Sequence, residues 1–267
     1  MVEIEPSSPF SSFQSLLNYF EWSEVHDVVP NVPNEIFNDL TDSGINSFRH
    51  RAFAYSFYYL SSYLYRNSKY GTLSLSDLYS LRLIELLYGD RKPINYITKR
   101  GGVLDAIGYT SSENDFPISC VIESTLTGFN LYSELNEVEK DQLIVPSGFI
   151  CKKPLKAFYR QKDDDYCTGT FFEFENTHRI DFTIFARCIS ASRYGFEQFY
   201  IFSFLSAFEQ FINSKSNVYK SYIALSLNLS PKNLNRILSN LEKLKLVKFK
   251  YSDGFSYITR KKVAQKK

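Results

Sequence analysis

The sequence predicts a mainly helical α+β fold, built as two domains joined by a charged linker. The chain has 267 residues, more than one domain usually contains, so two domains of roughly 100 to 150 residues each are expected. Hydrophobic residues make up 44% and charged residues 22%, which is the balance of a globular protein. Segments with apolar residues at helical spacing are followed by short β-prone runs, and this order gives the fold class.

The first half of the chain is predicted to hold an N-terminal arm and a first domain. Residues 1–47 form the arm, because they combine four prolines with short apolar pieces. The domain, residues 48–125, opens with a core helix, because residues 48–66 carry apolar side chains at spacings of three and four. A second helix, a short third helix opened by Pro93, and a β-hairpin within residues 107–122 complete it.

The second half is predicted to hold the linker and a second domain. Residues 126–168 are dense in charges of both signs and show no sustained hydrophobic period, which is typical of a linker. The second domain, residues 169–267, begins with alternating residues that indicate a β-hairpin with His178 exposed at its turn. The helix expected from Tyr194 to Ile212 carries more apolar residues than one face needs. It is therefore buried or pairs with a second subunit, and we predict a homodimer that pairs through it and through the helix at residues 48–66.

Positive charge is concentrated at the C-terminal end. Residues 215–267 contain 13 Lys and Arg against two acids, Glu242 and Asp253, whereas residues 1–214 contain 18 bases and 27 acids. The overall charge of +2 therefore hides a strongly basic end on an acidic body. Such a field attracts polyanions, and double-stranded nucleic acid is the partner that it fits best.

The basic end also carries a helix-turn-helix pattern followed by a hairpin. Residues 220–227 predict a first helix, and after a turn Ser230 caps a second helix that Pro231 opens. Two β-prone runs, 246–251 and 255–259, surround an Asp-Gly pair, which is a strong signal for a tight turn. This order resembles the winged helix-turn-helix family of DNA-binding proteins, in which an L-x-L-S turn leads into the recognition helix. The resemblance implies that the second helix reads DNA and that the hairpin is the wing.

On a helical wheel the second helix has one apolar side and an opposite side that is polar and basic. Arg236 stands in the middle of the polar side, and we expect it to contact a base, since Arg pairs with guanine and Asn with adenine. Lysines of the hairpin and of the tail are expected to contact phosphates. The predicted DNA-binding residues are Ser230, Lys232, Asn233, Asn235, Arg236, Ser239, Asn240, Lys243, Lys248, Lys250, Arg260, Lys261 and Lys262.

The predicted first domain has the helix and hairpin order of a winged helix as well. Two winged-helix-like domains on one chain resemble plasmid replication initiators, which grip repeated origin sequences with both domains. Two interpretations stay open for the first domain, because it either touches DNA or packs and dimerises without it. In the first case its contacts are expected to be Arg91, Lys92, Asn95, Thr98, Lys99 and Arg100.

The resemblance implies a sequence-specific protein that binds double-stranded DNA, and three functions follow from it. The leading one is a replication initiator or maintenance factor of a plasmid or other mobile element. The next is a dimeric transcriptional regulator that binds an operator. A nuclease or other enzyme with an accessory DNA-binding end has the least support.

Sequence motifs for catalysis and metal binding are missing. The cysteines, Cys120, Cys151, Cys167 and Cys188, form no C-x-x-C pair, the three histidines are widely spaced, and no glycine opens a phosphate-binding loop. We therefore expect no enzymatic activity, no metal and no cofactor. With no signal peptide pattern and no apolar run of membrane length, the expected location is the cytoplasm, with reduced thiols.

Overall fold

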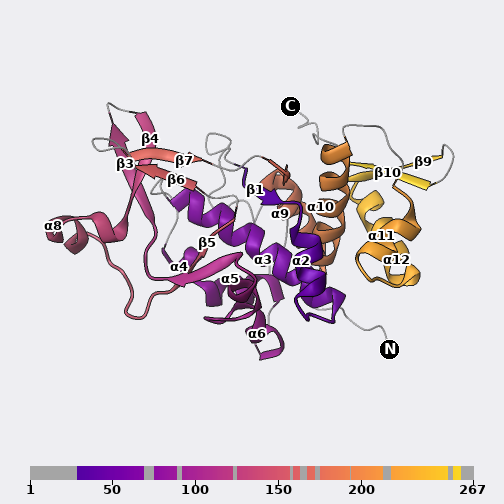
Figure 1. The fold of residues 1–267 in the computed structure, drawn as a ribbon, viewed down its shortest axis with the longest axis horizontal. Helices are drawn as coiled ribbons and strands as arrows, with labels where there is room; N and C mark the ends of the chain where they lie inside the picture. The colour runs from indigo at the N-terminus through magenta and orange to yellow at the C-terminus, as the bar shows by residue number, and fades with distance from the viewer. Residues whose placement is uncertain are drawn as a thin grey trace. The chain divides into compact units, whose positions relative to one another are not determined.

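The computed structural model describes residues 29–68, 75–88, 92–122, 125–156, 159–162, 167–171, 175–192, 194–212, 218–251 and 255–259. Helices predominate in these ranges, and the strands are short and join in two-stranded ladders (Figure 1). The predicted fold class, α+β and mainly α, is confirmed.

The chain divides into two compact units, and each is made of more than one stretch of sequence. The C-terminal unit combines Pro33–Ser56 with the chain from Asn176 onward, whereas the central unit contains Phe57–Glu175. Helix α3 (Phe48–Asn67) crosses the boundary, so its first residues belong to one unit and its last residues to the other. This division differs from the predicted one, which placed that helix wholly in a domain ending at residue 125.

The central unit holds small helices followed by three antiparallel ladders. Strand β2 pairs with β5, β3 with β4, and β6 with β7. Its elements after α3 are α4 (Leu75–Leu78), α5 (Ser80–Tyr88), η3 (Lys92–Ile94), α6 (Asn95–Thr98), α7 (Val103–Ala106), β2 (Thr110–Glu113), β3 (Pro117–Ile122), β4 (Thr125–Leu131), η4 (Tyr132–Glu134), α8 (Glu137–Asp141), β5 (Cys151–Pro154), β6 (Tyr159–Lys162) and β7 (Cys167–Phe171).

Two expectations for this part of the chain differ from the structure. The hairpin expected within residues 107–122 does not form, because β2 takes β5 as its partner and β3 takes β4. The segment 126–168, expected to be a linker, contains strands and the helix α8, and its strand β5 is held in a ladder that begins at the pair Thr110 and Pro154. Pairing between distant segments therefore orders residues whose own composition is that of a loop.

The C-terminal unit is mainly helical and ends in a hairpin. Its elements are α2 (Ile36–Asp42), the first turns of α3, β8 (Thr177–Arg179), α9 (Phe182–Ala191), α10 (Gly195–Ile212), α11 (Lys220–Ser226), α12 (Pro231–Lys243), β9 (Val247–Tyr251) and β10 (Phe255–Thr259), with β1 (Asn31–Pro33) entering it. The predicted hairpin at the start of the second domain required a second strand ending near residue 189. That prediction is wrong, because this sequence forms the helix α9. Asp181 starts α9 by accepting a hydrogen bond from the backbone N–H of Thr183 at 2.7 Å.

Helix α10 lies in the middle of the C-terminal unit and is buried on every side from residue 195 to residue 207. It packs on α9, α12, β8 and β10. A side chain at Gly195 would collide with the carbonyl group of Cys188, so glycine lets α9 and α10 approach closely. The homodimer was predicted because this helix has more apolar residues than one face needs. Residues 195–207 are already buried within the chain, so these residues no longer support the predicted dimer.

His178 is fully buried in the C-terminal unit, so its predicted position at an exposed turn is wrong. Its Nε2 lies 2.7 Å from the hydroxyl of Tyr55, and its Nδ1 lies 2.8 Å from Oδ1 of Asn34. Because the amide oxygen only accepts, Nδ1 carries the proton and Nε2 accepts from the hydroxyl. The ring also stacks on Phe37, with centroids 5.5 Å apart. These partners are more than 100 positions away in the sequence, which explains why local sequence did not reveal the burial.

We predict that acid lowers the free energy of unfolding through His178. Burial lowers the pKa of its side chain to about 3, below the unfolded value of roughly 6.5, so between these values only the unfolded chain takes up this proton. The stabilisation that comes from keeping His178 neutral is complete above the pKa that His178 has in the unfolded chain. It is lost as the pH falls toward the pKa that His178 has in the folded protein. Between pH 7 and pH 5 the loss from this group should be about 2 kcal/mol, measured by urea denaturation.

The variant His178→Gln supplies the comparison, because an amide keeps hydrogen-bonding capacity but does not titrate in this range. Its unfolding free energy should change less between pH 7 and pH 5 than that of the unaltered protein. Equal changes in both proteins would contradict the assignment of the effect to His178.

Candidate nucleic-acid interface

Helices α11 and α12 are joined by a short turn, as the sequence predicts. Asn228 adopts a left-handed backbone conformation, with φ of 46°, and the N–H of Leu229 donates to the carbonyl of Ala224 at 2.9 Å. This closes the end of α11. Ser230 then caps α12 by accepting from the N–H of Asn233, and Pro231 fills the first helical position. The caps and the proline set where α12 begins.

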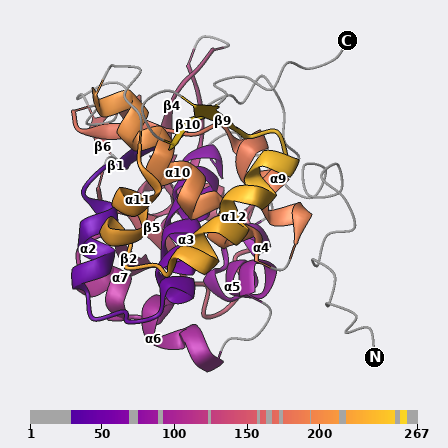
Figure 2. The ribbon, with the colours of Figure 1, turned by 90° about the vertical axis from the view of Figure 1, so that its right-hand side faces the viewer.

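Helix α12 has a buried face and an exposed face. Leu234, Ile237, Leu238 and Leu241 are buried, which matches the apolar side predicted from the wheel. Figure 2 shows α11 and α12 on the side of the C-terminal unit that is turned to the viewer. The exposed residues are Pro231, Lys232, Asn233, Asn235, Arg236, Ser239, Glu242 and Lys243, and Asn240 is partly exposed. Seven of the predicted contact residues on α12 are therefore exposed at least in part.

Two of these residues have partners inside the unit. Nη2 of Arg236 donates to Oε2 of Glu197 on α10 at 2.8 Å, and the Arg236 side chain is 46% exposed against 8% for Glu197. Its guanidinium also lies 5.7 Å from the ring centroid of Tyr194. Asn235 accepts a hydrogen bond from Nζ of Lys220 on α11 at 2.9 Å. Arg236 is therefore held toward α10, a tie that the wheel did not reveal.

The hairpin of β9 and β10 follows α12 directly. Its ladder runs from the pair Val247 and Thr259 to the pair Tyr251 and Phe255. Val247 is buried and Lys248 is exposed, as expected for alternating sides of a strand. Lys250 pairs with Ser256 in this ladder. Beyond that backbone pairing, the predicted contacts of Lys250, and those of Arg260, Lys261 and Lys262, lie outside the described residues.

The charge of this region is strongly one-sided. The stretch 218–251 contains seven Lys and Arg and one acid, Glu242. Lys232, Lys243 and Lys248 are exposed, and no salt bridge joins them to another residue of the part of the chain that the structure describes. Unpaired cations at the surface keep their full attraction for a polyanion. We call α12 and β9, with the exposed side chains named above, the basic face.

Arg51 fixes the turn between α11 and α12 from inside the unit. Its side chain is 2% exposed, and Nη2 donates to the carbonyl of Leu227 at 2.9 Å. Nη1 donates to the carbonyl of Ile45 at 2.7 Å. Leu227 is the C-cap of α11, so the guanidinium satisfies a carbonyl that the helix leaves without a partner. This contact couples the start of α3 to the helix-turn-helix segment.

In the central unit the second set of predicted contact residues is only partly exposed. Lys92, Asn95, Lys99 and Arg100 are exposed on a short turn around α6. Thr98 is 3% exposed, so its predicted contact with a partner is wrong. It lies on the inner side of α6 beside the buried Ile97. Arg91 lies outside the described residues.

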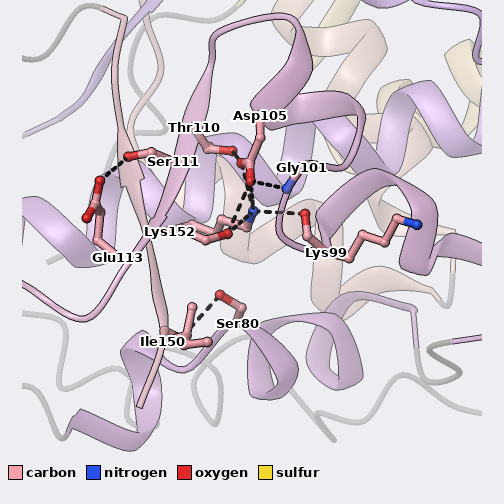
Figure 3. Close-up of polar contacts among 10 residues, drawn as sticks. Ser80, Lys99, Gly101, Asp105, Thr110, Ser111, Glu113, Ile150 and Lys152 are labelled. Carbon is pink, nitrogen blue, oxygen red and sulfur yellow. Dashed lines mark hydrogen bonds and ion pairs between the residues drawn. The ribbon is translucent and has the colours of Figure 1, made fainter. Parts of the chain in front are cut away.

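A buried ion pair fixes the chain beyond this turn (Figure 3). Nζ of Lys152 lies 2.7 and 2.8 Å from the carboxylate oxygens of Asp105, 2.7 Å from Oγ of Ser112 and 3.3 Å from the carbonyl of Lys99. Asp105 also accepts from Oγ1 of Thr110 at 2.6 Å and from the N–H of Gly101 at 3.0 Å. Burial lowers the pKa of Lys152, and the hydrogen bond and charge of Asp105 oppose this. The network ties α7, β2 and β5 to the carbonyl of Lys99.

Sequence reasoning missed several residues of these sites. Glu197 on α10, Tyr194 just before α10 and Arg51 on α3 support the basic face, and Lys152 supports the turn in the central unit. One signal was present, because Glu197 is an acid at the start of the mostly apolar helix α10, and a buried acid needs a cation or hydrogen-bond donors. The identity of its partner could not be read from local sequence.

Comparison with protein-family models, with curated proteins and with solved structures gives no match. Within the described residues, no group of three or more His, Cys, Asp or Glu side chains is arranged to hold a metal ion. The same residues contain no helix whose length and apolar content would let it cross a membrane. A function is therefore inferred from the geometry and charge of the basic face.

We predict that Lys152 and Asp105 depend on each other for stability. Lys152→Met should lower the free energy of unfolding by about 3 to 5 kcal/mol, because it leaves the Asp105 carboxylate without its buried cation. The double variant Lys152→Met, Asp105→Leu should lose less than the sum of the two single variants in urea denaturation. Lys153→Met is the matched control, since it removes the same charge from the neighbouring position of β5, which is partly exposed. Equal losses from the two lysine variants would show that the network adds no stability.

Proposed function

We propose that this protein binds double-stranded DNA through the basic face, with α12 in the major groove and the β9–β10 hairpin against the backbone. The observation that carries the proposal is the exposed side of α12, which presents amides, a hydroxyl and cations and is followed by the exposed Lys248 of β9, with Glu242 as the single acid in the stretch 218–251. Amide and guanidinium groups are the side chains that pair with base edges, and lysines neutralise phosphates.

The arrangement of the elements supports the same proposal. Three helices, α10, α11 and α12, precede an antiparallel hairpin, and α10 packs on both α12 and β10. This is the order of a winged helix-turn-helix domain, whose second helix of the turn motif enters the major groove. An α-helix with its side chains fits the roughly 12 Å width of that groove. The capped start of α12 also offers backbone N–H groups to a phosphate.

Two biological roles are consistent with such a DNA-binding face. We favour a replication initiator or maintenance factor of a plasmid or mobile element, a protein that acts on DNA in the cytoplasm without catalysing a reaction. The alternative is a transcriptional regulator, which would bind an operator as a dimer. Footprinting on the DNA that surrounds the gene distinguishes them, because repeated short sites indicate an initiator and one palindrome over a promoter indicates a regulator.

We predict that Lys232→Ala, Lys243→Ala and Lys248→Ala each weaken binding to duplexes of any sequence. Each should reduce the slope of log affinity against log salt concentration by about one, because each removes one phosphate contact and the counterion that it releases. The measurement is fluorescence anisotropy with a random-sequence 20-base-pair duplex over a salt series.

Lys140→Ala is the matched control, since it removes the same charge from α8 in the central unit. It should leave the slope unchanged. If the three variants and the control behave alike, or if the unaltered protein does not bind duplex DNA, the basic face is not a DNA-binding surface.

A further inference from the structure

We infer that Glu197 is a positioning residue for Arg236, and that it aims the free edge of this guanidinium at a guanine in the bound DNA. The inference rests on the proposed function, because it assigns one side chain of the basic face to one base. It differs from the prediction made from the wheel, in which Arg236 acts alone.

The geometry divides the Arg236 guanidinium into two parts. Nη2 of Arg236 donates one hydrogen bond to Glu197 at 2.8 Å, and the Arg236 side chain is 46% exposed. Glu197 is the only hydrogen-bond partner that the described residues give to Arg236. A guanidinium carries five N–H donors, so four remain for a ligand. Two donors in a fixed fork are what the O6 and N7 acceptors of guanine require.

Glu197 is well placed to hold this fork still. Its side chain is 8% exposed, and it lies in the first turn of α10, within the buried residues 195–207, so packing restricts its movement. Tyr194 lies beside the same guanidinium, at 5.7 Å from ring centroid to Cζ. Tyr194 in turn has Arg49 over its ring at 4.7 Å. An arginine that is already ordered loses less side-chain entropy when it binds, so a fixed geometry favours one base over the others.

A purely structural role for the pair makes a different prediction. If the pair only ties α12 to α10, its loss should weaken binding to all duplexes alike, through a displaced helix. If Glu197 positions Arg236 for a base, loss of either residue should remove the preference for guanine at one base pair and leave the other preferences unchanged. Comparing the DNA sequences that each variant selects therefore distinguishes the two roles.

The experiment is selection of bound duplexes from a pool with a randomised 20-base-pair core, carried out with the unaltered full chain, Arg236→Gln and Glu197→Gln. We expect a motif with a guanine whose preference falls about tenfold or more in Arg236→Gln, the size of a lost bidentate contact. Glu197→Gln should reduce the preference at the same base pair by a smaller factor, since the amide oxygen still accepts from Arg236 but no longer carries a charge. Lys140→Ala, on α8 in the central unit, is the control and should leave the motif unchanged.

The charge-exchanged double variant Glu197→Arg, Arg236→Glu provides a second measurement. It puts opposite charges back between α10 and α12, so thermal unfolding should occur closer to the unaltered temperature than in Arg236→Gln, but the guanine preference should not return. A guanine preference that is unchanged in either single variant, or that is restored by the exchange, would overturn the inference. If the unaltered protein binds duplexes without selecting any motif, the proposed sequence-specific function fails instead.

Discussion

The burial of residues 195–207 of α10 on all sides is the constraint on which the C-terminal unit depends. A helix without a solvent face needs neighbours around its whole circumference, and α9, β8, α12 and β10 supply them. The close approach of α9 is allowed by Gly195, which presents no Cβ to the carbonyl of Cys188. Because α12 and the hairpin are two of these neighbours, the elements that carry the basic face pack on the same core as the rest of the C-terminal unit.

Three buried polar side chains around this core make specific contacts. Arg51 donates to backbone carbonyls, Glu197 pairs with Arg236, and His178 bridges Tyr55 and Asn34. An unpaired polar group at these depths would cost free energy, so each contact allows only a narrow range of positions for its partners. The helix-turn-helix segment is thus fixed by apolar packing and also by hydrogen bonds that have direction.

Sequence reasoning succeeded where the signal was local and failed where the partner was distant. Ser230 and Pro231 are adjacent signals for the start of α12, so the position of the helix could be predicted. The spacing of its leucines and isoleucine then predicted its buried face. The ladder of Thr110 with Pro154, by contrast, joins segments that carry no mutual signal in a single sequence. The same holds for the hydrogen bond between Arg236 and Glu197, which are 39 positions apart. Arg236 was predicted to contact a base, and its contact with Glu197 could not be predicted from local sequence. Local rules therefore described the exposed surface better than the interior behind it.

The divided sequence of the C-terminal unit has a consequence for the order in which the protein can assemble during synthesis. Arg51 and its acceptor at Leu227 are 176 positions apart, and the whole of Phe57–Glu175 is made between them. At translation rates of about 5 to 20 residues per second, the early part of α3 waits on the order of ten seconds or more for its partners. Throughout that interval its aromatic residues have no α10 to pack against. Until the last third of the protein emerges, the nascent chain therefore exposes aromatic side chains that make it prone to aggregation.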